Sequence, residues 1–294
     1  MANTIALAKN YTNMLDEVYR IESVTSDLIS PPSMMRAGAN ANEILYPQIE
    51  VSGLGDYSRN SGYTGGTVSV VWKTATFNYD RGTKLVVDTM DDEESFNIAF
   101  GMAGGTLQRE KVAPEADAFF FSTICQLADV SAADAVTYAD AAEFLAALIE
   151  ATTVMDDDEV PAEGRYLYAT ATLINGIMAL DTTKSREVLG NFAKIVKVPR
   201  GRFYTKVDLL DGESEGEEAG HYTQAADGAE LNFVIVHKPC LIKFDKHVAS
   251  DVIPPSLNAD SDGYISKYRK YGMVDVYENK RAGIYYSAKA VESE

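Results

Sequence analysis

One long helical segment constrains the fold of this chain more than any other feature. A short strand at residues 84–88 leads into three acids at 92–94, which favour a helix start because the N-terminal end of a helix is partially positive. Apolar residues then recur at helical spacing, and Pro114 lies in the middle. Because proline lacks an N–H, it predicts a kink or a restart there. If helical throughout, residues 92–128 would span roughly 55 Å at about 1.5 Å per residue, which favours an extended, thin molecule.

The segments before this helix lack cover of their own. Residues 1–42 show no continuous periodic pattern, so we expect an arm that needs a partner surface. Residues 53–66 are rich in glycine and predict a flexible, exposed loop. Residues 67–87 are rich in β-branched and aromatic side chains and predict a β-hairpin that reverses near residues 80–82. Either its own domain or another molecule packs against this hairpin.

The rest of the chain predicts an α+β fold in which helices are grouped early and strands late. We expect a helix at residues 138–152 with Thr137 as its N-cap, and a short helix near 173–180. The predicted strands are 166–170, 194–198, 231–237, 241–247, 272–278 and 283–287.

Charge and cysteine content argue against several classes of protein. The net charge of −18 argues against a nucleic-acid reader, because such affinity comes mainly from cationic contacts to phosphates. No run of about 18 apolar residues predicts a transmembrane helix, and residues 1–9 do not read as a secretory signal. Cys125 and Cys240 are too few for a disulfide framework, so we expect both to be reduced core residues of a protein made in cytosol.

Charge is unevenly distributed between two neighbouring stretches. Residues 194–206 contain five cations and no acid, and residues 208–218 are strongly acidic. One interpretation is a solvated strand end followed by an acidic loop. The other is that copies of the chain meet through opposite charges, which would guide their association and register.

No motif predicts catalysis or a bound cofactor. The chain has no G-x-S-x-G motif, no Walker-type phosphate loop and no C-x-x-C pair. His221, His237 and His247 are far apart in sequence, so they do not show metal-ligand spacing. The acidic runs 91–94 and 156–159 could chelate a hard cation, but helix capping and solvation also account for them. We therefore predict a protein that is not an enzyme, with no catalytic, cofactor-binding or metal-binding residues.

A series of short motifs spans residues 44 to 287 in a specific order. They are Asp80-Arg81-Gly82, Val87-Asp88-x-Met90-Asp91-x-Glu93-Glu94, Pro114-Glu115-Ala116-Asp117-Ala118, Pro161-x-x-Gly164-Arg165, Val196-Lys197-Val198-Pro199, Val236-His237-Lys238 and Asn279-Lys280-x-x-Gly283-Ile284-Tyr285. In this order they resemble the major capsid proteins of tailed bacteriophages.

The resemblance implies the Hong Kong-type capsid fold and a division of the chain. The expected parts are an N-terminal arm (1–43), an extended β-hairpin loop (44–90), a peripheral domain with the spine helix (91–165), an axial domain (166–255) and strands that return to the peripheral domain (256–294). The extended loop would overlie a neighbouring subunit.

The resemblance also implies a function and partners. The chain would self-assemble through hexameric and pentameric capsomers into the icosahedral shell around the double-stranded DNA of a tailed phage. It would be part of the virion and assemble in the cytoplasm of the host bacterium, without contact to a membrane. Further expected partners are a separate scaffolding protein, since the chain lacks a long N-terminal extension, a portal, and packaged DNA held without sequence-specific contacts.

Alternative functions stay open at this point. An encapsulin-like nanocompartment shell that encloses a cargo enzyme would use the same fold, and the contents of purified particles would separate it from a virus. A monomeric enzyme or carbohydrate-binding protein is a third alternative, which predicts a particle near 32 kDa. Some relatives crosslink their subunits through Lys–Asn bonds, and Lys73 and Lys84 lie near the extended loop, but the sequence specifies no partner for them.

Overall fold

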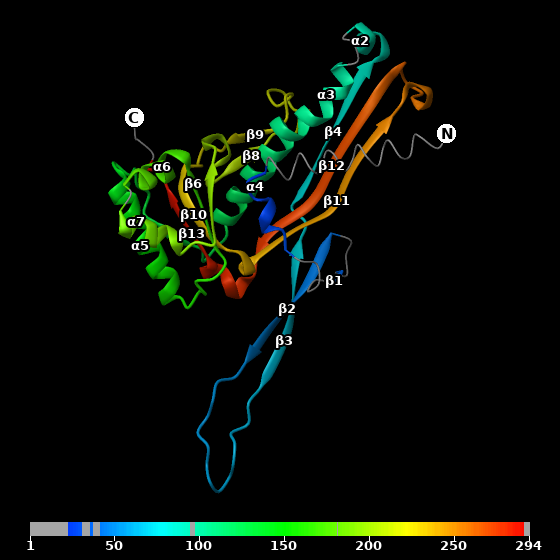
Figure 1. The fold of residues 1–294 in the computed structure, drawn as a ribbon. Helices are drawn as coiled ribbons and strands as arrows, with labels where there is room; N and C mark the ends of the chain where they lie inside the picture. The colour runs from blue at the N-terminus through cyan, green and yellow to red at the C-terminus, as the bar shows by residue number, and fades with distance from the viewer. Residues whose placement is uncertain (1–22, 31–35, 38–41, 95–97, 181, 291–294) are drawn as a thin grey trace.

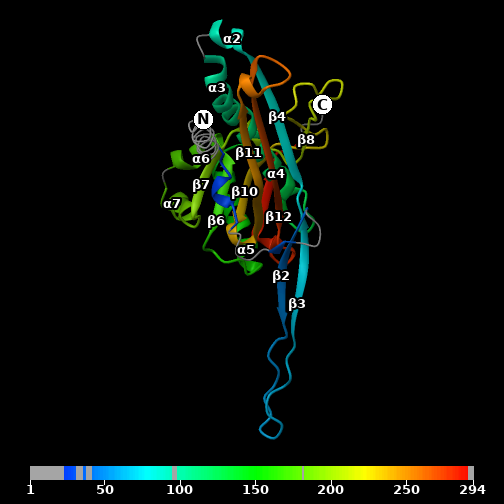
Figure 2. The same ribbon diagram turned by 90° about the vertical axis from the view of Figure 1, so that its right-hand side faces the viewer.

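The computed structural model describes residues 23–30, 36–37, 42–94, 98–180 and 182–290. Most of the predicted arm at residues 1–43 therefore lies outside the described residues. The described chain is elongated, with a hairpin that projects far beyond the remainder (Figures 1 and 2).

A long helix runs through the upper half of the molecule (Figure 1). The short helix α2 (Thr89–Glu94) precedes it, and α3 (Ile98–Leu107) continues through a π-helical turn (Gln108–Val112) into α4 (Ala113–Cys125). In the π turn, the N–H of Ala113 donates to the carbonyl of Gln108, five residues back. The helix is thus widened just before Pro114, which cannot donate. The predicted long helix is confirmed over residues 98–125, with a restart at the proline.

An antiparallel sheet lies along this helix in both views (Figures 1 and 2). We call it the long sheet; its order is β11 (Leu241–Ile253), β12 (Gly263–Val276) and β4 (Tyr79–Asp88). Ala113 and Ala116 of α4 pack against Tyr268 of β12. These small side chains let the helix approach the sheet closely.

A second, five-stranded sheet forms the broad end of the molecule. Its order is β5 (Ser131–Ala133), β13 (Ile284–Ala288), β10 (Leu231–His237), β6 (Arg165–Thr170) and β7 (Lys194–Val198). Side chains alternate between its faces. Phe233 and Ile235 join the core formed with α5 (Ala141–Asp157), α6 (Ala171–Leu180) and α7 (Thr183–Gly190). Val234 and Val236 point the other way and join Phe120 of α4.

The projecting hairpin consists of β2 (Glu43–Val51) and β3 (Val68–Thr76), joined by the glycine-rich residues 52–67. The prediction of a hairpin over residues 67–87 with a reversal near 80–82 is therefore wrong. β4 follows β3 without pairing to it and pairs instead with β12. Gly82 lies within β4 because a Cβ there would lie 2.9 Å from the carbonyl oxygen of Tyr268. This glycine permits a close strand approach and does not form a turn.

The remaining elements are short. The strand β1 (Arg36–Ala37) pairs with β2, and β8 (Val207–Leu209) pairs with β9 (Tyr222–Gln224). Five 3₁₀ turns lie at Ser26–Leu28, Arg200–Arg202, Lys238–Cys240, Pro255–Leu257 and Glu278–Gly283. Within the described residues, no helix is long and apolar enough to span a membrane.

Several details differ from the sequence prediction. The N-cap of α5 is Asp140, whose carboxylate accepts the N–H groups of Ala142 and Glu143, so the assignment of Thr137 is wrong. The helix α7 was not predicted. β11 and β12 are longer than predicted because they pair with each other along their length. Both cysteines are free and buried as predicted.

The last two strands belong to different sheets. β12 pairs with β4 in the long sheet, whereas β13 pairs with β10 in the five-stranded sheet. The domain boundaries implied by the resemblance stay a prediction.

Candidate functional site

One face of the projecting hairpin is apolar, and its outer part is exposed. Residues paired across the two strands point to the same face, and the pairs Pro47–Trp72, Ile49–Val70 and Val51–Val68 share one face. We call these six residues the apolar hairpin face. Its outer four side chains are between 53% and 68% exposed. A contiguous apolar surface of this kind marks an interaction site.

The opposite hairpin face is polar at its outer end and buried at its base. Ile44, Tyr46 and Ala75 pack against Ile242 and Met273 of the long sheet. The ion pair between Lys73 and Glu278, at 2.8 Å, lies at the same end. The hairpin is therefore fixed at its base while its outer half extends away from the chain (Figure 1).

The segment 23–30 is attached to the long helix by one buried carboxylate. Asp117 of α4 is fully buried and accepts hydrogen bonds from the Ser23 hydroxyl at 2.7 Å, from the Thr25 hydroxyl at 2.7 Å and from the N–H groups of Val24 and Thr25. The guanidinium of Arg202 lies 3.2 Å from its other side. The chain entering from the N-terminal side is thus held by polar contacts to α4.

A buried lysine holds the same segment from the long sheet. The Nζ of Lys243 donates to the carbonyl and to the hydroxyl of Thr25, at 2.8 and 2.7 Å. Burial, reinforced by nearby Lys270, lowers the pKa of Lys243 to about 8. Ser30 extends the attachment, since its N–H donates to the carbonyl of Lys243 and its hydroxyl to that of Leu241.

A second buried carboxylate joins the long helix, the long sheet and a loop. Glu115 of α4 accepts hydrogen bonds from the hydroxyl of Tyr79 at 3.1 Å and from Nε of Arg81 at 2.7 Å, and Nδ1 of His221 lies 3.5 Å away. Arg81 also donates to the carbonyls of Leu210 and His221. His221 has a φ of 75°, a left-handed conformation that is uncommon outside glycine.

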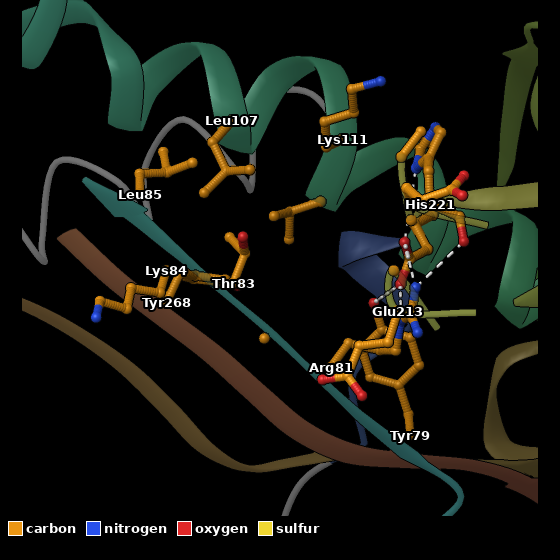
Figure 3. A pocket seen from close by; sticks show the side chains of 17 residues that line it. Tyr79, Arg81, Thr83, Lys84, Leu85, Leu107, Lys111, Glu213, His221 and Tyr268 are labelled. Atoms are coloured by element: carbon orange, nitrogen blue, oxygen red, sulfur yellow. Dashed lines mark hydrogen bonds and ion pairs between the residues drawn. The ribbon is translucent and has the colours of Figure 1, made fainter. Parts of the chain in front are cut away.

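These residues form one end of a pocket of about 660 Å³ (Figure 3). Figure 3 shows Leu107 and Lys111 reaching in from the long helix, Leu85 from β4, and Glu213 and His221 from the opposite loop. The pocket therefore lies where the long helix, β4 and the loop at residues 212–221 meet. Arg81 and Glu115 close its lower end.

The pKa of Glu115 predicts how the contribution of this contact to folding stability depends on pH. Burial alone raises its pKa, but the nearby imidazole of His221 and the hydrogen bonds from Arg81 and Tyr79 outweigh burial, and the folded pKa lies below the ordinary 4.5. A lowered acid pKa stabilises the folded state above the unfolded pKa, and this contribution is lost as pH falls through the folded pKa.

Replacing Glu115 by Gln is expected to lower the free energy of unfolding by about 3 kcal/mol at pH 7, because Arg81 then loses its buried partner. Urea unfolding at several pH values measures this effect, and the difference from the wild type should shrink below about pH 4.5. Glu213→Gln, an exposed change in the same pocket, is the control and should have little effect. A difference for Glu115→Gln that stays constant down to pH 3 would contradict the assignment.

The basic and acidic stretches do not pair as a block within the chain. Lys194 pairs with Asp27, Arg202 with Asp117 and Lys206 with Asp227. The acidic loop is organised by its own backbone: Asp211 accepts the N–H groups of Glu213 and Ser214. Hydrogen bonds from Ser214, the largest effect, and from Glu213 lower the pKa of Asp211 to about 2.

The expected absence of catalytic, cofactor-binding and metal-binding residues stays a prediction. Among the described residues, no three His, Cys, Asp or Glu side chains lie close enough to hold a metal ion. Lys73 is engaged by Glu278. The sequence did not predict the buried roles of Asp117, Glu115 and Lys243, because the two acids of α4 lie close together in one short acidic motif.

A long helix beside an antiparallel sheet, a five-stranded sheet at the broad end and a projecting apolar hairpin define the Hong Kong-type capsid fold. Solved structures of phage proteins share this fold. A chain of Mycobacterium phage Che8 is 14% identical with a TM-score of 0.59 over 90% of both chains. A chain of the capsid of cyanophage P-SCSP1u is 12% identical with a TM-score of 0.57, over 91% of this chain and 88% of that chain.

A chain of a virus-like particle from Pyrococcus furiosus is 9% identical with a TM-score of 0.59, over 96% of this chain and 99% of that chain. No protein-family model and no curated protein matches the sequence. At these identities the similarity establishes the fold, which agrees with the α+β capsid fold expected from the sequence motifs.

Proposed function

We propose that this chain is the major capsid protein of a tailed bacteriophage, the repeated subunit of an icosahedral shell that encloses double-stranded DNA. The single observation that carries the proposal is the apolar hairpin face, whose four outer side chains are each more than half exposed in the described chain. A neighbouring copy covers these side chains in a shell. The fold shared with chains of phage capsids supports the same role.

The proposed role is structural and involves no reaction. Many modest contacts between identical copies add up, because each contact raises the effective concentration of the next. Contacts between two different patches on each copy close into rings, which we propose to be hexameric and pentameric capsomers. The net charge of −18 lets packaged DNA lie against the shell without sequence-specific contact.

Expression of the chain in a bacterium tests this proposal. We expect assemblies far larger than the 32.0 kDa chain by sedimentation and negative-stain electron microscopy. We also propose that a separate scaffolding protein and a portal act in accurate assembly in the host cytoplasm. Expression alone should therefore give shells of irregular size. A stable monomer at all concentrations would overturn the shell function, and uniform closed shells made without any other protein would overturn the need for a scaffold.

The similarity to the particle of Pyrococcus furiosus favours one second candidate, a nanocompartment shell on the same fold that encloses an enzyme. The contents of particles purified from the natural source separate the two functions. Packaged double-stranded DNA supports the virion, and a co-purifying enzyme without DNA supports the compartment.

A further inference from the structure

The two outer edges of the five-stranded sheet have charged side chains of opposite sign beside them. In the order β5-β13-β10-β6-β7, each outer strand is paired on one side only among the described strands. Such edges are open to contact with another chain. The charged side chains beside β5 are acidic, and those along β7 are basic.

An acidic groove lies beside β5. It has a volume of about 800 Å³ and lies between β5 and one face of α5. Ala147 and Val154 of α5 and Tyr138 and Tyr285 give it an apolar floor. Its charged side chains are all acids, and no Lys, Arg or His lines it: Asp134, Glu143 and Glu150. All three acids are exposed.

A basic edge lies at the opposite side of the sheet, along β7 and the turn that follows it. Its cations are Lys194, Lys197 and Arg200, and all three are exposed. Asp27 pairs with Lys194, but Lys197 donates only to the neutral amide of Asn175, at 2.6 Å. Within the described chain, no carboxylate contacts Lys197 or Arg200 in an ion pair. The acidic loop that follows in sequence does not neutralise them, because Arg81 holds its two ends at the pocket.

The directions of the strands allow the two edges to meet in a ring. β5 is parallel to β13 and β7 is parallel to β6, while β10 is antiparallel to both β13 and β6. The two edge strands therefore run in the same direction. A rotation about an axis along the strands brings the β7 edge of one copy beside the β5 edge of the next and preserves this direction. Contacts between two different surfaces of this kind close into a ring.

We propose that the basic edge of one copy docks into the acidic groove of the next copy within each capsomer. This inference rests on the proposed shell function. Opposite charges steer the encounter and fix which edges meet, and like charges facing each other disfavour other arrangements. The proposal keeps the interpretation that copies meet through opposite charges, but it places the acids on α5 and beside β5 rather than in the loop at residues 208–218.

Charge reversal tests the proposal in the full-length chain. Glu150→Lys and Lys197→Glu each place like charges across the contact and should reduce the yield of assemblies about tenfold or more. Combining both changes in one chain exchanges the two opposite charges across the contact and should restore assembly. Glu215→Lys, which reverses one exposed acid in the loop, is the control and should assemble as the wild type does. Circular dichroism and unfolding midpoints confirm that each variant is folded.

Mixing the two single variants gives a sharper test. At the proposed contact, Glu150→Lys chains carry a lysine on both surfaces (positions 150 and 197) and Lys197→Glu chains a glutamate on both. The two kinds of chain therefore pair opposite charges only when they alternate. Alternation closes rings with an even number of subunits, so native mass spectrometry should find mixed hexamers and no mixed pentamers. If the wild type forms no assemblies, the shell function fails and this inference falls with it. If the wild type assembles and the single reversals assemble equally well, only the edge contact is wrong.

Discussion

Replacing Asp117 by Ala is expected to lower the free energy of unfolding by about 4 kcal/mol, because a fully buried carboxylate with several donors is removed at once. The loss leaves the N–H groups of Val24 and Thr25 without an acceptor, and Arg202 without its counter-charge. Each buried donor without a partner costs about 1–3 kcal/mol. The result should appear in urea unfolding as a lower midpoint with an unchanged slope.

The same change should release the segment 23–30 before the rest of the chain unfolds. Limited proteolysis of the folded Asp117→Ala variant should therefore cut near this segment faster than in the wild type. Thr25→Val removes the hydroxyl contacts to Asp117 and Lys243 but keeps the backbone contact. This matched variant should lose only about 1–2 kcal/mol. Equal losses for both variants would contradict the central role of the carboxylate.

The elements that could be predicted from sequence are those whose signal is local. The long helix follows from apolar spacing and acids at its start, and β10 from a run of β-branched and apolar residues that is buried throughout. The effect of Pro114 on the helix could be predicted without any tertiary contact, since proline removes one hydrogen-bond donor from the helix. The sequence analysis predicted a kink or a restart at Pro114 but not the π turn that precedes it.

The pairing of strands could not be predicted, because it depends on residues far apart in sequence. β3 and β4 are neighbours in sequence, yet β3 pairs with β2 and β4 with β12, about 190 residues away by the partners Arg81 and Lys270. The local sequence around Gly82 predicts a turn, but in the structure this glycine allows β4 to approach β12 closely. The same limit applies to the two edges of the five-stranded sheet, since Glu150 and Lys197 become related only through the strand order.

The buried carboxylates of the site show a similar limit. Asp117 and Glu115 lie within one short acidic motif of the long helix and would ordinarily be read as solvent-facing. Their partners come from residues 23–25, 79–81 and 202–221, and no local pattern links these segments. The glycine-rich loop at residues 53–66 followed from composition, and the structure places it between β2 and β3. The sequence assigned the wrong strands to the hairpin and left open whether another molecule covers it.

Placing an aspartate on the apolar hairpin face should abolish shell formation without unfolding the chain. Val70→Asp changes a side chain that is 53% exposed, so the unfolding midpoint of the unassembled chain should shift by no more than about 2 °C, as is usual for surface substitutions. In a shell the same carboxylate would be buried without a partner, which costs several kcal/mol at every copy. Because each shell repeats this cost many times, we expect loss of assembly.

The neighbouring residue provides a matched control, since Ser69 lies on the polar face of the same strand. Ser69→Asp adds the same charge one position away and should still form shells. Trp72, the only tryptophan of the chain, lies on the apolar hairpin face and reports its burial. Its fluorescence emission should shift to shorter wavelength as wild-type and Ser69→Asp chains assemble, and stay unshifted in Val70→Asp. Efficient assembly of Val70→Asp, or wild-type assembly with an unshifted emission, would show that this face is not covered by a neighbouring copy, and the main support for a shell function would be lost.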